Sequence, residues 1–360
     1  MTLERLDCRR LLGPDDFKPS APHLKVTGAF NPGAVPTGRD DEVVLLVRVT
    51  EDPAEQRPGS VGLPRYQRGE VVVDWLDNDQ VRFIDPRVVE VKATGNVRLT
   101  FTSHLRLVRL PDGRSVDPAT LASGPAMVPE TAFESFGVED PRIIPLDGRF
   151  YITYVAASTH GACTALAVTD DFESFERLGV IFPPENKDVL LFPEKVGGEY
   201  LGIHRPNPST HFTPPEMWLA RSRDLVHWGG HSVLVSTANA RDWTLGRIGG
   251  GCPPIRTDRG WLEVYHGNNK RPGSDEGDVG AYVGAAILLD PDDPSRLLGH
   301  TESPIMTPEA DFEKHGFVAN VVFPTGIVDR GETLWVYYGA ADRAAGMVEW
   351  RKEELLDRLT

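Results

Sequence analysis

Short runs of β-branched and aromatic residues, each preceded by a polar turn, recur along this chain. Five segments share the design, with glycine or aspartate in the turn and an apolar run behind it. Such a segment is typical of the second strand of a β-hairpin. The five segments are residues 38–49, 146–158, 196–206, 257–267 and 329–342. The pattern therefore predicts hairpins spread over the whole chain.

A second repeat connects two of these regions. Residues 169–179 (TDDFESFERLG) and 222–230 (SRDLVHWGG) place an aspartate, an apolar pair and an aromatic residue at matching steps, and both follow an alternating strand pattern. Recurring four-stranded units are what a β-propeller requires, so five signals predict five blades. A β-sandwich explains the strands equally well, but it leaves the repeated motif unexplained.

Helical periodicity is weak everywhere except at the C-terminus, with a further turn expected near residues 307–316. The 35 glycines and 30 prolines are dispersed, which favours many short strands joined by turns. We therefore predict an all-β fold, a five-bladed β-propeller with its active site in the central channel. It forms a single domain over residues 1–360, with an N-terminal extension of about residues 1–25 and a helical tail of about residues 346–360.

Composition narrows the function. The formal net charge of −15 makes general binding to nucleic acid or to an anionic membrane a poor hypothesis. Cys8, Cys163 and Cys252 are far apart and form no CxxC pair, so neither a disulfide framework nor a zinc site is indicated. The first residues are charged throughout, and no apolar run approaches the ~18 residues that span a bilayer. The expected location is the cytoplasm.

The stretch Glu139-Asp140-Pro141-Arg142 carries the first candidate chemistry. An acid that protonates a glycosidic oxygen must be held near the bond and kept from full ionisation. Pro141 fixes the backbone after Asp140, and Arg142 could pair with Glu139, which leaves Asp140 free to act. The alternative is a turn with a surface ion pair.

Basic residues beside strand signals form a second group. Lys187, Arg205, Arg247 and His266 could converge on one channel and bind an anion, with arginine as a bidentate clamp. His204 and His266 occupy the same place in two repeats. The glycines at 249–251 would let the backbone approach a ligand closely. Taken singly, each lysine or arginine is better explained as a surface charge and each histidine as a hydrogen-bonded core residue, and it is their placement at equivalent positions that favours a site.

Polar residues beside apolar strands form a third group suited to sugar hydroxyls. They are Asn31, Arg48, Asn320 and Asp342. Aromatic residues such as Tyr265, Trp243 or Tyr338 would cover the sugar ring faces. A turn at Asn31 and a loop cap at Asp342 are the alternatives. The chain has no nucleotide loop, GxSxG elbow or HExxH motif, and the cysteines are expected to be buried side chains.

Taken in order, these stretches resemble glycoside hydrolase family 130, the β-mannoside phosphorylases and related β-mannosidases. The resemblance covers about residues 30–342, and its motifs include FNPGAV, GVEDPRI, NKDVLLFPEK, RIGGGCPPI and YYGAAD. It implies a five-bladed β-propeller in which Asp140 is the sole catalytic acid. It also implies that Lys187, Arg205, Arg247 and His266 bind phosphate.

The same resemblance assigns the remaining site residues to the substrate. These are Asn31, Arg48, Glu139, Arg142, Asp188, His204, Tyr265, Asn320 and Asp342. Glu139 and Arg142 are expected to support Asp140. The implied activity is phosphorolysis of a short β-linked mannoside, such as a 1,2-linked manno-oligosaccharide, with inversion to α-mannose 1-phosphate. No metal and no cofactor besides inorganic phosphate as co-substrate is expected.

Two alternatives stay open, an inverting β-mannosidase of the same fold and a sugar-binding propeller without catalysis. An inverting hydrolase needs a second carboxylate to activate water, whereas phosphate needs cations to hold it, and all four basic positions are kept here. Lys187 stands where some members have arginine, and Cys252 where proline is common. The linkage and acceptor would be set by residues 240–247, 268–280 and an insertion after Glu51. A homo-oligomer is also left open.

Overall fold

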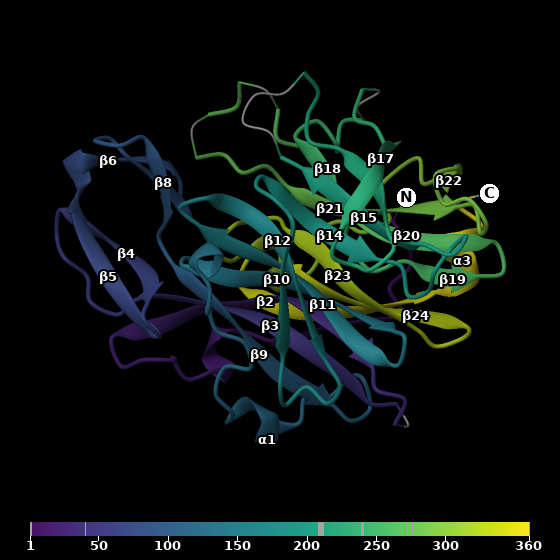
Figure 1. The fold of residues 1–360 in the computed structure, drawn as a ribbon, viewed down its shortest axis with the longest axis horizontal. Coiled ribbons are helices and arrows are strands. Elements are labelled where there is room, and N and C mark those ends of the chain that lie inside the picture. The colour runs from purple at the N-terminus through teal and green to yellow at the C-terminus, as the bar shows by residue number, and fades with distance from the viewer. Residues whose placement is uncertain are drawn as a thin grey trace.

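The fold is all-β, as the sequence predicted, and the described part of the chain forms six β-sheets and three short α-helices (Figure 1). The computed structural model describes residues 2–39, 41–207, 212–238, 241–271, 273–275 and 277–359. Asp40, Ala240, Pro272 and Glu276, which fall within segments discussed above, lie outside the described residues. No helix in the described ranges is long and apolar enough to cross a membrane.

Antiparallel sheets of neighbouring strands make up the body of the molecule. One sheet has the order β1-β25-β24-β23, with β1 (Asp7–Leu12), β25 (Ala344–Arg351), β24 (Thr333–Ala340) and β23 (Val322–Asp329). A second comprises β14 (Asn186–Leu191), β15 (Tyr200–Pro206), β16 (Met217–Ser222) and β17 (Trp228–Val235). A third comprises β18 (Arg247–Gly249), β20 (Gly260–Asn268), β21 (Tyr282–Leu289) and β22 (Leu297–His300), with β19 (Ile255–Thr257) also paired to β20.

The largest sheet has seven strands, but it is two units joined by a single contact. One unit contains β2 (Leu24–Pro36), β3 (Val43–Pro53) and β9 (Thr102–Leu110). The other contains β10 (Gly137–Leu146), β11 (Arg149–Ser158), β12 (Gly161–Thr169) and β13 (Glu176–Phe182). Between β9 and β10 the only paired residues are Ser103 and Gly137 in the described chain. The strands of the body therefore fall into five groups.

The inner strands are buried on both faces, which explains their nearly continuous apolar sequence. In β3, Val43, Leu45 and Val47 pack in one core with residues of β24 and β25. Val44 and Leu46, which point the other way, pack in a second core with residues of β10, β11 and β12. Strand β3 is thus held between two neighbouring groups of strands, and the position of Arg48 in the middle of the strand is fixed with it.

Both sequence repeats are confirmed. The five predicted segments contain β3, β11, β15, β20 and β24, each the second strand of an antiparallel pair. In the other repeat, Asp171 and Asp224 accept backbone hydrogen bonds from the residues two and three positions further on. Phe172 and Leu225 have φ angles of 63° and 68° in the two turns. The same turn therefore connects β12 to β13 and β16 to β17.

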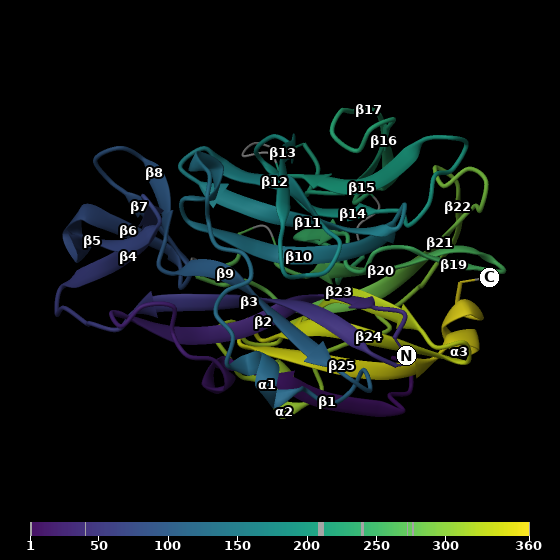
Figure 2. The same ribbon diagram turned by 60° about the horizontal axis from the view of Figure 1, so that its bottom comes forward.

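An arm projects from one end of the molecule between β3 and β9 (Figures 1 and 2). It consists of a hairpin, β4 (Ser60–Gln67) and β5 (Glu70–Asp77), and a three-stranded sheet, β6 (Val81–Asp85), β7 (Val88–Val91) and β8 (Asn96–Leu99). A 3₁₀-helix, Asn78–Gln80, joins the two, and further 3₁₀-helices span Pro14–Asp16 and Ala132–Glu134. This arm is the insertion after Glu51 that the sequence left without a structure.

The two ends of the chain differ from the prediction. The expected extension of about residues 1–25 includes β1, which pairs with β25, and the start of β2. The expected helical tail from about residue 346 is shorter, because β25 continues to Arg351 and α3 spans only Lys352–Leu356. Trp350 is fully buried, so strand alternation decides that stretch. The other helices are α1 (Pro118–Leu121) and α2 (Asp311–Lys314), the latter within the predicted turn.

A buried carboxylate ties the N-terminal segment to the body. Glu313 of α2, which is fully buried, accepts hydrogen bonds from Arg5 Nη1 at 2.7 Å and from Tyr338 Oη at 2.6 Å. It also accepts from the backbone nitrogens of Glu309 and Ala310. Four donors therefore depend on one side chain.

Replacing Glu313 with alanine should lower the free energy of unfolding by about 3–5 kcal/mol, because a buried guanidinium and a buried hydroxyl lose their acceptor. Chemical denaturation at neutral pH measures the loss. The matched control is Glu309→Ala, whose half-exposed carboxylate lies 3.6 Å from Arg5 Nε and should matter by less than about 1 kcal/mol. Equal losses in the two variants would contradict this account.

Candidate active site

One cavity of about 460 Å³ lies where the inner strands meet. Most of the residues singled out from the sequence line it, from strands far apart in the chain. They are Asn31, Arg48, Glu139, Asp140, Lys187, Asp188, Arg205, Arg247, His266 and Asp342. The sequence-predicted groups are therefore brought together in one place.

Three inner strands carry the same backbone device. The register of β2, β10 and β14 shifts at a bulge, and each bulge contains a short polar residue with positive φ. The φ angles are 48° at Asn31, 48° at Asp140 and 56° at Asp188. Asparagine and aspartate tolerate this left-handed region better than other side chains, and bulges next to active sites turn a side chain in a new direction. Each bulge thus turns one polar group out of its ladder and into the cavity wall.

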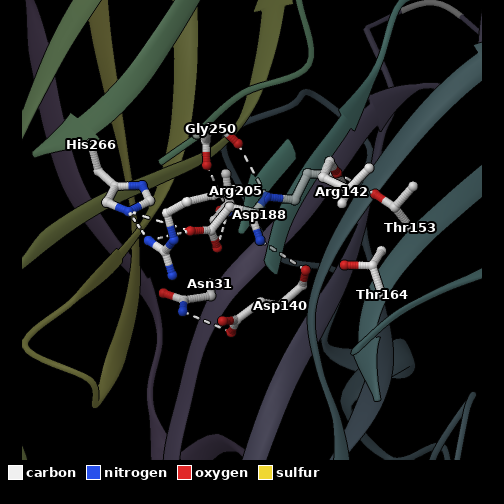
Figure 3. Close-up of polar contacts among 12 residues, drawn as sticks. Asn31, Asp140, Arg142, Thr153, Thr164, Asp188, Arg205, Gly250 and His266 are labelled. Atoms are coloured by element: carbon white, nitrogen blue, oxygen red, sulfur yellow. Dashed lines mark hydrogen bonds and ion pairs between the residues drawn. The ribbon is translucent and has the colours of Figure 1, made fainter. Parts of the chain in front are cut away.

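The Asp140 carboxylate is held by two donors, Asn31, whose contact Figure 3 shows, and Arg48. Asn31 Nδ2 and Arg48 Nη1 each donate to its Oδ1 at 2.8 Å. The second nitrogen of the fork, Arg48 Nη2, lies 2.8 Å from Glu139 Oε1. Burial alone would raise the pKa of Asp140, but Arg48, Arg142 and Asn31 outweigh it and lower the pKa to about 2. With these protein groups alone, Asp140 is ionised at neutral pH.

Arg142 does not pair with Glu139, contrary to one expectation from the sequence. Its buried guanidinium donates to the backbone carbonyl oxygens of Asp140 at 2.8 Å, Gly251 at 3.1 Å and Gly250 at 3.2 Å. Successive side chains of β10 diverge at the bulge, so Glu139 meets Arg48 instead. Arg142 fixes the backbone on both sides of the cavity, which is the supporting position expected for it.

The predicted anion-binding residues form one corner of the cavity. Lys187 and Arg205 are paired across β14 and β15, while Arg247 and His266 come from β18 and β20. Asp188 Oδ2 lies 2.7 Å from Arg205 Nη1 in the same corner. Burial would raise the pKa of Asp188, but Arg205, His266 and Arg142 lower it, so the carboxylate is ionised. This corner therefore combines cations with one fixed negative charge.

His266 requires a correction, because it is not one of the cations. Burial, reinforced by the neighbouring arginines, lowers its pKa to about 3 against the opposing effect of Asp188. Its ring is neutral at physiological pH and binds as a hydrogen-bonding group. The positive charge of the corner comes from Lys187, Arg205 and Arg247, with Arg142 behind them.

The triple glycine at 249–251 also acts differently from the expectation. None of the three lines the cavity. A Cβ at Gly249 would meet Asp188 Oδ2 at 2.5 Å, and one at Gly251 would meet the Val264 carbonyl oxygen at 2.3 Å. Because these glycines have no side chain, neighbouring protein atoms pack closely against them, and the space is not open to a ligand.

Apart from Arg142, three residues assigned to the substrate lie outside the cavity lining. His204 and Tyr265 each precede a cavity residue in a strand, so they point to the opposite face. His204 stacks on Phe182 with ring centroids 4.6 Å apart, and Tyr265 is fully buried in a hydrophobic core. Asn320 lies beside a separate pocket and offers its carbonyl oxygen to Tyr282 N. The aromatic candidates Trp243 and Tyr338 are absent from the lining as well.

The arm supplies site residues that the sequence did not reveal. Arg87 lies between two carboxylates, with Nη2 at 2.9 Å from Asp85 and Nη1 at 3.7 Å from Asp342. Burial raises the pKa of Asp342 although Arg87 and Arg48 oppose it. The aromatic lining is likewise new, and it consists of Phe30, Phe101, Phe136, Tyr282, Phe317 and Phe323. The charged residues of this insertion are a weak sequence signal for a site, because nothing in the sequence says toward which part of the molecule the insertion folds.

This arrangement places a carboxyl group beside a cationic corner in a half-enclosed cavity, which suits transfer of a sugar onto an oxyanion. A family model described as β-1,4-mannooligosaccharide phosphorylase, of glycoside hydrolase family 130, matches residues 103–360. The chain belongs to glycoside hydrolase family 130.

Two relatives in family 130 are named as phosphorylases of 1,2-linked mannosides. A β-1,2-mannobiose phosphorylase of Listeria innocua is 37% identical over 100% of this chain and 99% of its own length. A 1,2-β-oligomannan phosphorylase of Thermoanaerobacter sp. is 37% identical over 62% of this chain and 71% of its own. A solved structure of the Listeria innocua enzyme with β-1,2-mannobiose covers 98% of this chain and 99% of its own, with a TM-score of 0.89 and 36% identity.

A buried acid supports the family 130 site from behind. Glu263 of β20 is fully buried, and its Oε1 accepts a hydrogen bond from Gly251 N at 3.1 Å. Burial raises its pKa to about 8, although Gly251 N and Arg142 oppose the shift. Glu263 therefore stands next to the glycine whose carbonyl oxygen Arg142 holds.

Glu263→Gln should make the free energy of unfolding fall less as the pH rises. Because the folded pKa exceeds the unfolded one, the folded state holds an extra proton between about pH 4.5 and 8, and stability is lost as pH rises through that window. Across this window the free energy of unfolding of the variant should rise relative to that of the wild type by on the order of 5 kcal/mol. Denaturation series at several pH values measure it, with the surface variant Glu309→Gln as control. Parallel curves for wild type and Glu263→Gln would contradict the assignment.

Proposed function

We propose that this chain is an inverting β-1,2-mannoside phosphorylase, which cleaves a short mannoside with inorganic phosphate to give α-mannose 1-phosphate. The observation that carries the proposal is the Asp140 carboxyl beside the Lys187, Arg205 and Arg247 corner in one cavity. The full-length similarity to a β-1,2-mannobiose phosphorylase supports the linkage. The proposal requires no metal and no organic cofactor.

The residues take distinct roles in this proposal. Asp140 gives its proton, through the 3-hydroxyl of the mannosyl unit, to the glycosidic oxygen, which leaves as a hydroxyl of the released sugar. A phosphate oxygen held by the cationic corner attacks C1 from the opposite face, so one C–O bond breaks and another forms with inversion. Asn31, Arg48 and Asp342 hold the mannosyl unit. Arg142 and Glu139 keep Asp140 in place.

The low pKa of Asp140 gives phosphate a second role. An acid with a pKa of about 2 is almost fully ionised at neutral pH and cannot donate a proton. Phosphate adds negative charge beside Arg142 and Arg205, and bound sugar excludes water, and both effects favour the protonated carboxyl. In the proposed mechanism, binding of the nucleophile therefore prepares the acid.

We also propose that the five groups of strands are the five blades of a β-propeller and that the cavity lies in its central channel. The single Ser103–Gly137 pair between two otherwise separate units and the repeated turns support this arrangement. A cytoplasmic location suits the reaction, because the sugar phosphate that it forms is retained in the cell.

Turnover of β-1,2-mannobiose should depend on inorganic phosphate and release α-mannose 1-phosphate. The measurement compares both products, the sugar phosphate and free mannose, with and without phosphate. Mannose release that is unchanged without phosphate would identify a β-mannosidase instead. Binding of mannobiose without turnover under either condition would identify a non-catalytic sugar-binding protein. The reverse reaction, with α-mannose 1-phosphate and a panel of acceptors, checks the linkage.

Asp140→Asn should lower kcat by about 10²–10⁴-fold, since the amide keeps the shape of the side chain but cannot donate the proton in its place. In the wild type with saturating phosphate, kcat should fall as pH rises through the pKa of Asp140 in the loaded complex. That pKa should lie well above the value of about 2 set by the protein groups alone. A variant that retains wild-type kcat would remove Asp140 from the mechanism.

A further inference from the structure

The cationic corner contains buried polar atoms that lack a hydrogen-bond partner within the described chain. Two are donors, Nε of Arg205 and Nε of Arg247, and one is an acceptor, Oδ2 of Asp188. Nδ1 of His266 is the fourth. Since an unsatisfied buried polar atom costs about 1–3 kcal/mol, such a group is expected to have a ligand that matches it.

The tautomer of His266 follows from its neighbour. Arg205 Nη1 lies 3.3 Å from His266 Nε2, and a guanidinium nitrogen can only donate. Nε2 of the neutral ring therefore accepts, and the ring hydrogen is on Nδ1. The unpartnered atoms of this corner are thus three donors and a single acceptor.

The acceptor is held firmly in place. Thr164 Oγ1 and Thr153 Oγ1 donate to the carbonyl oxygens of Asn186 and Val189, on either side of Asp188. The Asp188 side chain is only about 4% exposed and lines the cavity. Arg205 Nη1 is close to Oδ2 but is not aimed at it as a hydrogen-bond donor, so the ion pair supplies charge without satisfying the oxygen.

We propose that Asp188 recognises the proton of the phosphate and so makes the site selective for a protonated oxyanion. Hydrogen phosphate carries one hydroxyl at neutral pH, which donates to Asp188 Oδ2. Its other oxygens accept from Arg205, Arg247 and His266. Sulfate has the same size and shape but no proton at neutral pH, so one of its oxygens would face an ionised carboxylate. Arsenate, which is protonated like phosphate, would be accepted.

This inference deepens the proposed function and rests on it for the identity of the anion. Asp188 otherwise has two explanations. It could only neutralise Arg205, or it could accept a hydroxyl of the mannosyl unit. Neither alternative makes the site distinguish phosphate from sulfate, so anion selectivity separates the inference from both.

The test is titration calorimetry of the full chain with inorganic phosphate, sulfate and arsenate at neutral pH. The wild type should bind phosphate and arsenate at least about 100-fold more tightly than sulfate, as expected where a buried acceptor needs a donor from the ligand. In Asp188→Asn the amide can donate to sulfate, and the preference should fall below about 10-fold.

The matched control is Asp342→Asn, which removes the same charge from the same cavity but lies against Arg87 and not against Arg205. It should keep the wild-type ratio of phosphate to sulfate affinity. Thermal unfolding checks that each variant is folded, and Asp188→Ser replaces the asparagine variant if that one is not.

Two results would overturn the inference. One is wild-type protein that binds sulfate within about 10-fold of phosphate. The other is an Asp188→Asn variant that keeps the selectivity while its KM for mannobiose rises, which would assign Asp188 to the sugar. A selective phosphate site in a protein that does not cleave mannosides would leave this inference standing and overturn the proposed function instead.

Discussion

The site depends on one backbone constraint, the bulge that interrupts three inner strands at Asn31, Asp140 and Asp188. A regular strand would direct these residues into the cores between neighbouring sheets, where a carboxylate would have to be desolvated without enough partners. The left-handed residue in each bulge turns its polar group toward the cavity instead. Positive φ costs a residue with a Cβ roughly 1–3 kcal/mol, and such strain persists only where packing on both sides imposes it. The tightly packed faces of β3 and its neighbours supply that packing.

The same constraint organises the charges. Because the residues of the three bulges line one cavity, the buried arginines serve more than one bulge. Arg48 holds Asp140 and Glu139 together, and Arg142 joins the Asp140 backbone to the glycines that pack on Asp188. A buried charge that loses its partner is far more costly than a surface one. The carboxylates and guanidinium groups of the cavity are thus mutually dependent, and the site behaves as one network.

Much of this was predictable from the sequence. The hairpin repeats predicted the strands. At Asn31-Pro32 and Asp140-Pro141 the sequence suggested turns as the alternative to functional residues, whereas the structure has bulges within strands there. The errors have a common physical origin. His204 and Tyr265 follow the right motifs, but the sequence does not say which face of a strand turns inward, and their neighbours are the ones that reach the cavity. The charge of His266 depends on burial, and the place of Arg87 depends on how an inserted arm folds back. Both are long-range properties that no local pattern contains.

The depressed pKa of Asp140 bears on why phosphate and not water would be the nucleophile. Water is neutral, so its arrival beside Arg205 and Arg142 leaves the field on Asp140 unchanged, and the carboxyl stays ionised when a proton is needed. Phosphate brings its negative charge to the same cations, so these cations lower the pKa of Asp140 less. A hydrolase built on this cavity would need to weaken the hold of the Arg48 fork on Asp140 or to add a base that activates water. Charge on the nucleophile and protonation of the acid are therefore two parts of a single electrostatic requirement, which phosphate meets and water does not.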